Sequence, residues 1–369
     1  MKSVKHKVSR GEQVSADSRA TISAVDLFCG AGGLSWGLKE AGIEVVAGVD
    51  LDDACAYPFE QNIGAKFIKA DIAKVTSDEF EDLWIPGSKR LLAGCAPCQP
   101  FSSHRRGQDT RNEKNWSLLN EFSRLIEEIK PDYVTMENVT GLAKQTVFKS
   151  FIKNLKNLGY FIDYNILYGP EFGLPQARRR LVLVGSLSSN ISVPAGTFSA
   201  DNFITVKDAI GDLPKIGHGE SSKIDPLHIA RKFTDTNLRR IQASVPGGTW
   251  LDWPEELRAN CHKKASGLTF KSFYGRMSWD LPSPTITTQA YNYGTGRFGH
   301  PEQDRSITPR EAAILQGFPR SYKFYNPEKR LSIEKVGRLI GNAVPPPFGK
   351  AVGKVFLETV NGHDKLKGE

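Results

Sequence analysis

Short apolar runs alternate with helical periodicity through the first half of the chain. Runs suited to one buried strand each cover residues 24–29, 44–50, 90–95, 132–139, 160–168 and 179–187. Between them, residues 117–130 place their apolar side chains on one helical face, which Pro131 ends, and residues 52–62 and 147–158 also read as helices. This alternation predicts an α/β fold in which helices cover both faces of a mostly parallel sheet. Ligands of such sheets bind at the carboxyl ends of the strands.

The pattern changes near residue 188. From there to residue 305 the periodicity fades and Gly, Pro, Ser and Thr become frequent. We therefore expect a second, smaller domain that is irregular and β-rich, built of short strands and loops. Helical patterning returns over residues 310–316 and 332–339, whereas residues 1–20 form a polar, basic tail that we expect to be disordered.

Composition narrows the class of protein. A chain of 369 residues suits one large domain plus a smaller one. It has no apolar stretch long enough to span a bilayer, and residues 1–20 lack the apolar centre of a secretory signal, so we expect a cytoplasmic protein without a membrane partner. Its five cysteines are too few and too scattered for a disulfide framework, which predicts reduced thiols.

The net charge of +8 favours a polyanionic partner only weakly. The distribution of charge along the chain is more informative. Residues 223–276 contain ten Lys and Arg but five Asp and Glu, and six aromatic residues lie among them. That mixture suits contact with phosphates and stacking on bases. A solvated basic face is an equally good interpretation of the charge alone.

A glycine turn follows the first predicted strand, within the segment Asp-Leu-Phe-Cys-Gly-Ala-Gly-Gly that begins at Asp26. Glycines let a backbone approach a ligand closely, although tight turns need them for steric reasons as well. Asp50 ends the second strand, where a carboxylate can hold ribose hydroxyls. Asp71 follows a further short strand, which lies between residues 62 and 71, and could accept an adenine amino group. The spacing G-x-G-G differs from the dinucleotide fingerprint. An adenosine-containing cofactor that is not a dinucleotide fits better.

Cys98 lies between Pro97 and Pro100, just after the strand over residues 90–95. A cysteine is more often buried and inert than reactive. The pair Cys95-x-x-Cys98 has no second pair at zinc spacing, so we expect no metal. Residues 102–115 are polar and rich in arginine, a composition typical of a mobile lid over an anionic substrate.

Two further clusters follow strands. Glu137 ends an otherwise apolar strand, where a buried carboxylate is costly unless it is paired or used, so it is either a structural residue or a functional one. Gln176, Arg178 and Arg180 open another strand and share one face by the period of two. They suit binding of a polar or anionic group, and a surface ion-pair ladder is the alternative.

The segments described above, taken in their order along the chain, resemble the cytosine-C5 DNA methyltransferase family. They are Asp26–Gly33, Asp50, Asp71, Gly94–Ser102, Met136–Val139 and Gln176–Arg180. The match continues with Arg-Glu-Ala-Ala-Ile-Leu-Gln-Gly-Phe-Pro from Arg310 and Gly-Asn-Ala-Val-Pro from Gly341, and spans residues 24–348. The resemblance implies a Rossmann-like class I methyltransferase sheet with a target-recognition domain. The catalytic domain would comprise residues 21–187 plus 331–369, and the target-recognition domain residues 188–330.

The resemblance also implies roles for individual residues. Cys98 would attack C6 of cytosine, Glu137 would contact N3 and the exocyclic amine, and Arg178 and Arg180 would lie near O2 and the active-site backbone. Family members more often carry Glu where Asp50 stands. The residues implied around S-adenosylmethionine are Phe28, Gly30, Gly32, Gly33, Asp50, Asp71, Ile72, Pro97, Asn342 and Val344. Those implied to contact DNA are Ser102, Arg105, Arg106, Thr285 and Thr287.

The implied activity transfers a methyl group from S-adenosylmethionine to C5 of a cytosine flipped out of double-stranded DNA. Thiolate addition at C6 makes C5 nucleophilic and replaces one hard step by easier ones. We expect a monomer that protects host DNA in a restriction-modification or related defence system, with companion proteins. The alternatives are a transfer-RNA cytosine methyltransferase, a catalytically silent DNA-binding relative and a nucleotide-binding oxidoreductase. The target sequence cannot be read from the chain.

Overall fold

A seven-stranded sheet in the order β3-β2-β1-β4-β5-β7-β6 forms the centre of the larger part of the molecule. The computed structural model describes residues 21–97, 117–264, 267 and 271–367. The strands are β1 (Ile22–Leu27), β2 (Glu44–Asp50), β3 (Lys66–Lys69), β4 (Lys89–Gly94), β5 (Tyr133–Asn138), β6 (Phe161–Tyr168) and β7 (Arg179–Ser186). Strands β1 to β5 pair in parallel, and β7 runs antiparallel to both of its neighbours. The mostly parallel α/β sheet predicted from the apolar runs is therefore confirmed.

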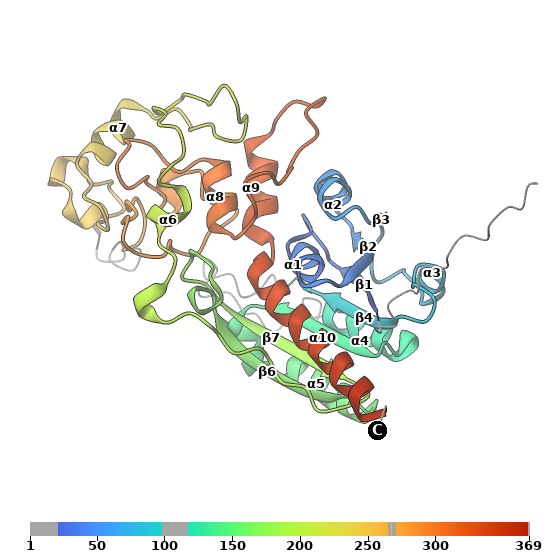
Figure 1. Cartoon of the computed structure of the whole chain (residues 1–369). Coiled ribbons are helices and arrows are strands. Elements are labelled where there is room, and N and C mark those ends of the chain that lie inside the picture. Colours follow the sequence, from blue (N-terminus) through green and yellow to red (C-terminus); the bar gives the residue numbers. More distant parts are fainter. Residues whose placement is uncertain (1–20, 98–116, 265–266, 268–270, 368–369) are drawn as a thin grey trace, which may run out of the picture.

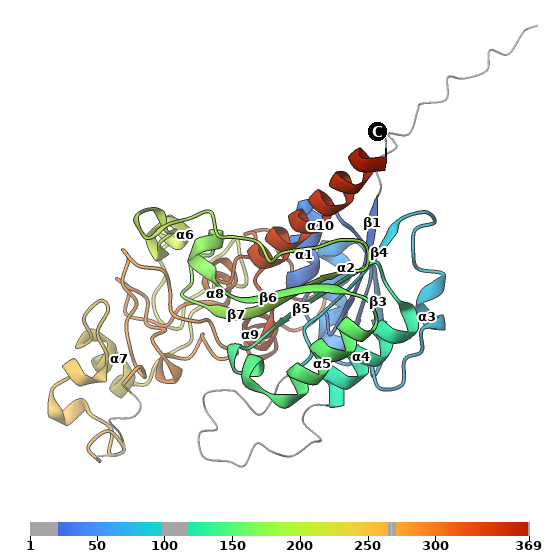
Figure 2. The same cartoon turned by 90° about the horizontal axis from the view of Figure 1, so that it is seen from below.

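Helices cover both faces of this sheet (Figures 1 and 2). On one face lie α1 (Gly33–Ala41), α2 (Ala56–Ile63) and α10 (Pro346–Lys367), and on the other α3 (Asp78–Glu81), α4 (Ser117–Ile129) and α5 (Thr146–Asn157). Alternate residues of each strand serve the two faces: Ala24 packs with the first group of helices, and Val25 with the second. The sheet is thus buried on both sides, which explains its continuous apolar runs.

Residues 188–330 form a smaller region beside the carboxyl ends of the strands (Figure 1). Its helices are α6 (Val206–Ile210), α7 (Asp235–Gln242) and α8 (Pro309–Leu315), and α9 (Ile333–Asn342) follows it. The expected β-rich character is wrong for the described part of this region, which contains isolated bridges such as Pro246 with Arg276 and no strand. Prolines cannot donate to a ladder, and buried arginines tie the loops together instead.

Those arginines bond mainly to backbone carbonyls and acids of the same region. Arg276 donates to the carbonyl oxygens of Ile241 and His300, at 2.7 and 3.1 Å. Arg305 makes a two-pronged ion pair with Glu311, at 2.7 and 2.8 Å, and both side chains are almost fully buried. Such charged networks fix irregular loops where no sheet does.

One apolar core joins the smaller region to the sheet. It includes Ala31 and Cys55 from the loops after β1 and β2, Ile286 from the smaller region and Leu339 from α9. The domain boundaries at residues 187 and 331 stay predictions, although the sheet does end at Ser186. Within the described residues, no helix is long and apolar enough to cross a membrane.

Candidate active site

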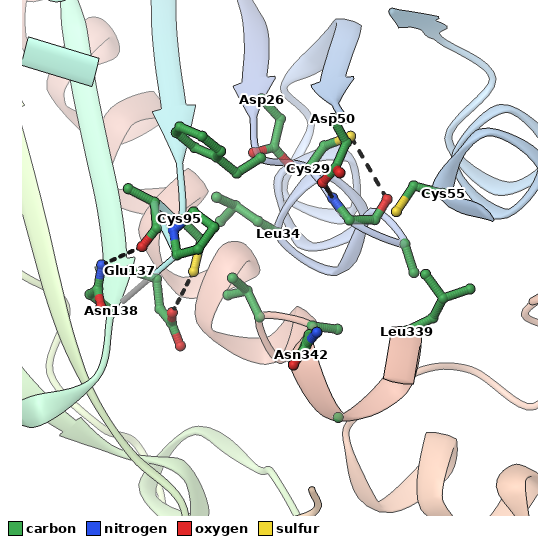
Figure 3. Close-up of a pocket in the computed structure, with 18 of the residues that line it drawn as sticks. Asp26, Cys29, Leu34, Asp50, Cys55, Cys95, Glu137, Asn138, Leu339 and Asn342 are labelled. Atoms are coloured by element: carbon green, nitrogen blue, oxygen red, sulfur yellow. Dashed lines mark hydrogen bonds between the residues drawn. The ribbon is translucent and has the colours of Figure 1, made fainter. Parts of the chain in front are cut away.

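A cavity of about 640 Å³ opens at the carboxyl ends of β1, β2, β4 and β5. Figure 3 shows Asp26 and Asp50 on one side of it, Cys95 and Glu137 on the other, and Asn342 below them. Because parallel strands end at one edge, these side chains meet although they are far apart in the sequence. The cavity is lined by nine of the residues predicted to act: Phe28, Gly30, Asp50, Pro97, Glu137, Arg178, Arg180, Asn342 and Val344.

The loop after β1 is held by Asp50. The amide of Gly30 donates to Asp50 Oδ2 at 2.9 Å, and the amide of Asp52 donates to Oδ1 at 2.9 Å. The loop needs left-handed backbone at Phe28, with φ of 58°, and at Gly30, with φ of 53°. A left-handed non-glycine residue is uncommon and is typical of a functional loop. Burial raises the pKa of the Asp50 carboxyl.

Gly32 and Gly33 do not line the cavity in the described structure. A Cβ built on Gly33 would lie 2.1 Å from the carbonyl oxygen of Val344, and Gly32 has a φ of 85° at the start of α1. These glycines let α1 begin against the segment that follows α9. Their contribution to the cavity is indirect, because they allow Val344 to approach it.

Asp26 was not among the predicted site residues, yet it lines the cavity and is only 1% exposed. Ser35 Oγ donates to Asp26 Oδ2 at 2.6 Å. Burial raises the pKa of this carboxyl to about 7, against a smaller opposite effect of the Ser35 hydrogen bond. The signal in the sequence was a single acid in the apolar strand over residues 22–27.

Glu137 stands at the other end of the cavity, where β4 and β5 end side by side. Arg180 Nε lies 3.1 Å from Glu137 Oε1, and the Cys95 thiol donates to Oε2 at 3.2 Å. The neighbouring Asn138 donates through Nδ2 to the carbonyl oxygen of Ala96 at 3.0 Å. This bond ties β5 to the backbone that leads into Pro97.

Gln176 and Arg178 lie just before the first residue of strand β7, and Arg178 lines the cavity together with Arg180. Gln176 is buried and donates to the carbonyl oxygen of Leu315 at 3.0 Å, so it joins the sheet to the end of α8. Arg178 Nη1 donates to the carbonyl oxygen of Ile286 at 3.0 Å. Burial, aided by Arg180, lowers the pKa of Arg178 to about 9.

Besides Gly32 and Gly33, four predicted residues lie in the described structure but outside the cavity. Asp71 accepts a hydrogen bond from the amide of Ala73 at 3.1 Å, and Ile72 is part of the core beneath the sheet. Thr285 donates to the carbonyl oxygen of Ala177 at 3.0 Å, whereas Thr287 is half-buried. Cys98, Ser102, Arg105 and Arg106 lie outside the described residues.

Charge is divided between the two ends of the cavity. Asp26, Asp50 and Asp52 gather at one end, where Arg338 of α9 pairs with Asp52. Arg338 could not be predicted as a site residue, because the sequence alone does not show that it pairs with Asp52, which is 286 residues away. An acidic end suits a ligand with hydroxyl groups or a positive charge. Among the described residues, no group of three or more His, Cys, Asp or Glu side chains could hold a metal.

Comparison with known proteins identifies the family. A family model described as C-5 cytosine-specific DNA methylase matches residues 22–358. The type II methylase M.HgiDII of Herpetosiphon aurantiacus is 47% identical over 351 residues, which cover 94% of this chain and 98% of that protein. The type II methyltransferase M1.BsuMI of Bacillus subtilis (strain 168) is 34% identical, over 88% of this chain and 78% of its own.

Solved structures agree on the fold. A prophage-encoded Escherichia coli protein, described as a DNA modification methyltransferase, superposes with a TM-score of 0.71 at 23% identity and covers 92% of this chain and 100% of its own. The sheet order is that of class I methyltransferases, which confirms the fold class. With the family model and the two bacterial relatives, the chain belongs to the C-5 cytosine-specific DNA methylase family and is a DNA (cytosine-5)-methyltransferase.

Proposed function

We propose that this methyltransferase modifies a cytosine within a specific DNA sequence as the protective enzyme of a type II restriction-modification system. The observation that carries the proposal is the near full-length similarity to two bacterial proteins that are named type II enzymes. A companion nuclease that cuts the same sequence would be its partner. The bacterial relatives also support a cytoplasmic location.

Family membership implies S-adenosylmethionine as the methyl donor, and the cavity fits this group. Carboxylates at the end formed by Asp26 and Asp50 suit ribose hydroxyls and a positively charged sulfonium. When bound, the cofactor supplies the methyl group. We assign its binding to the cavity-lining residues that the family resemblance implies around it: Phe28, Gly30, Asp50, Pro97, Asn342 and Val344. No metal is required by this assignment.

The protein groups act on the cytosine ring. In the proposed mechanism the Cys98 thiolate adds to C6, and the electron pair of the C5–C6 bond becomes available at C5 for the methyl group. A proton shared between Glu137 and N3 offsets the negative charge that arrives on the ring. Arg180, which pairs with Glu137, holds the carboxyl group against the base. Water then takes the C5 proton, and the electron pair of the C5–H bond reforms the C5–C6 double bond and expels the Cys98 thiolate.

The monomeric state stays a proposal, and one feature of the sheet supports it. Strand β6 lies at the edge, where free amides would invite pairing with a second copy. The amides of Tyr164 and Ile166 donate instead to the side chains of Asp163 and Asn165, at 2.9 and 2.8 Å. These donors are therefore occupied within the chain.

The test of this mechanism is a covalent trap. DNA containing 5-fluorocytosine should form an adduct with wild-type enzyme in the presence of cofactor, because fluorine cannot leave as the proton does. Cys98→Ser should form no adduct and transfer no methyl group, while binding of the cofactor is largely retained. Full methyl transfer by Cys98→Ser would contradict the proposed role of Cys98. Bisulfite sequencing of a genome that carries the gene, with a deletion strain as control, would reveal the target sequence.

A further inference from the structure

The Cys95 thiol is the group of interest, because nothing in the proposed mechanism uses it. Cys95 follows β4, whose last residue, Gly94, is in register with Met136 of β5. Cys95 and Glu137 are the next residues after this pair, so they lie side by side at the edge of the sheet where the parallel strands end. The thiol donates to Glu137 Oε2 at 3.2 Å (Figure 3).

The two oxygens of Glu137 have different partners. Arg180 lies 3.1 Å from Oε1, but that ion pair lacks the alignment of a hydrogen bond. Among the described residues, Cys95 is the side chain that donates a hydrogen bond to this carboxylate. A carboxylate oxygen has two lone pairs, so Oε2 keeps one for the edge of a base beside its bond to the thiol.

We propose that Cys95 is a positioning residue that fixes the plane of the Glu137 carboxyl group toward the flipped cytosine. The proposal rests on the proposed role of Glu137. Arg180 sets the position of one oxygen and the thiol sets the other, so the carboxyl group cannot rotate about its last bond. The base then meets a carboxyl group that is already oriented.

A thiol suits this position for two reasons. It is a weak donor, so it orients the carboxylate and leaves the strong hydrogen bonds to the base. Its apolar character also fits its surroundings, since Cys95 packs against the core that contains Leu34 and Val344.

Three substitutions separate donation from packing. Cys95→Ala removes the donor, Cys95→Val fills the site without one, and Cys95→Ser restores a hydroxyl donor of similar size. We expect Ala and Val to lower kcat and the rate of adduct formation with 5-fluorocytosine DNA by about five- to ten-fold, a typical loss for one intramolecular hydrogen bond. Serine should recover most of that rate. KM for the cofactor should stay unchanged in all three.

Thr135→Val is the matched structural control. Thr135 lies two residues before Glu137 on β5 and donates to the carbonyl oxygen of Leu183 at 2.9 Å, but it does not line the cavity. Its substitution should lower stability without changing kcat. If Cys95→Ala lowers kcat only in proportion to a loss of stability like that of Thr135→Val, Cys95 is a packing residue.

A double-mutant cycle completes the test. In a Glu137→Gln background, Cys95→Ala should cause little further loss, because the group that it positions is already altered. Additive losses would overturn the proposal, as would wild-type kcat in Cys95→Ala. A Glu137→Gln enzyme with wild-type activity would instead reject the proposed role of Glu137, so the two failures are distinguishable.

Discussion

Replacement of Asp26 by asparagine should stabilise the protein, and more at high pH than at low pH. The folded state holds the Asp26 proton up to about pH 7, whereas the ordinary pKa is 3.8. The stabilising effect of the neutral carboxyl group is therefore complete below pH 3.8 and is lost as the pH rises through about 7. At 1.36 kcal/mol per pKa unit, the full cost of ionising the group is about 4 kcal/mol. Asparagine keeps the shape and carries no charge.

The measurement is the free energy of unfolding in urea at pH 5 and pH 8, without cofactor. The free energy of unfolding of Asp26→Asn should exceed that of wild type by about 2–3 kcal/mol more at pH 8 than at pH 5. The difference is smaller than the full cost of ionising Asp26, because part of that cost is already present at pH 5. Asp201→Asn is the control, because Asp201 is exposed and its substitution removes no buried carboxyl group. An equal effect of Asp26→Asn at pH 5 and pH 8 would refute the reasoning.

Two further substitutions test how the parts of the molecule fit together. Gly33→Ala should cost about 1–3 kcal/mol of stability and weaken cofactor binding measured by calorimetry, because its Cβ would collide with the Val344 carbonyl. Gly362→Ala, which meets nothing within 4 Å, should have neither effect, and equal affinity in both variants would argue against the contact. Arg305→Met should destabilise the protein by about 3–5 kcal/mol in urea unfolding, because it leaves Glu311 charged and buried. Adding Glu311→Gln should recover part of that loss, and a double variant less stable than the single one would contradict this account.

The sheet could be predicted because its signals are local. The segment over residues 44–50 is a strand with those same bounds, Asp50 is its last residue, and Glu137 is the last residue but one of β5. Side chains at the ends of parallel strands must share an edge, so the sequence was enough to bring them together. Asp26 carried the same signal as Glu137, a single acid in an apolar strand, and was overlooked as a site residue.

The roles of some site residues could not be predicted, because they depend on contacts between residues far apart in the sequence. Gln176 and Arg178 looked like alternate residues of one strand, but both lie before it and bind backbone carbonyls more than 100 residues away, at Leu315 and Ile286. From the sequence alone, Arg338 is one of the polar residues on the exposed face of a predicted helix. Only the structure shows that it pairs with Asp52. Local periodicity contains no information about such partners.

The late position of Asn342 and Val344 in the chain has a consequence for synthesis. A ribosome that has made residues 1–330 has completed the strands and the smaller region, but not the wall of the cavity that these two residues form. The nascent chain therefore exposes the acidic end of the cavity until its last helices emerge. A product that stops before Asn342 lacks part of the pocket, so methylating activity should require synthesis to pass Val344.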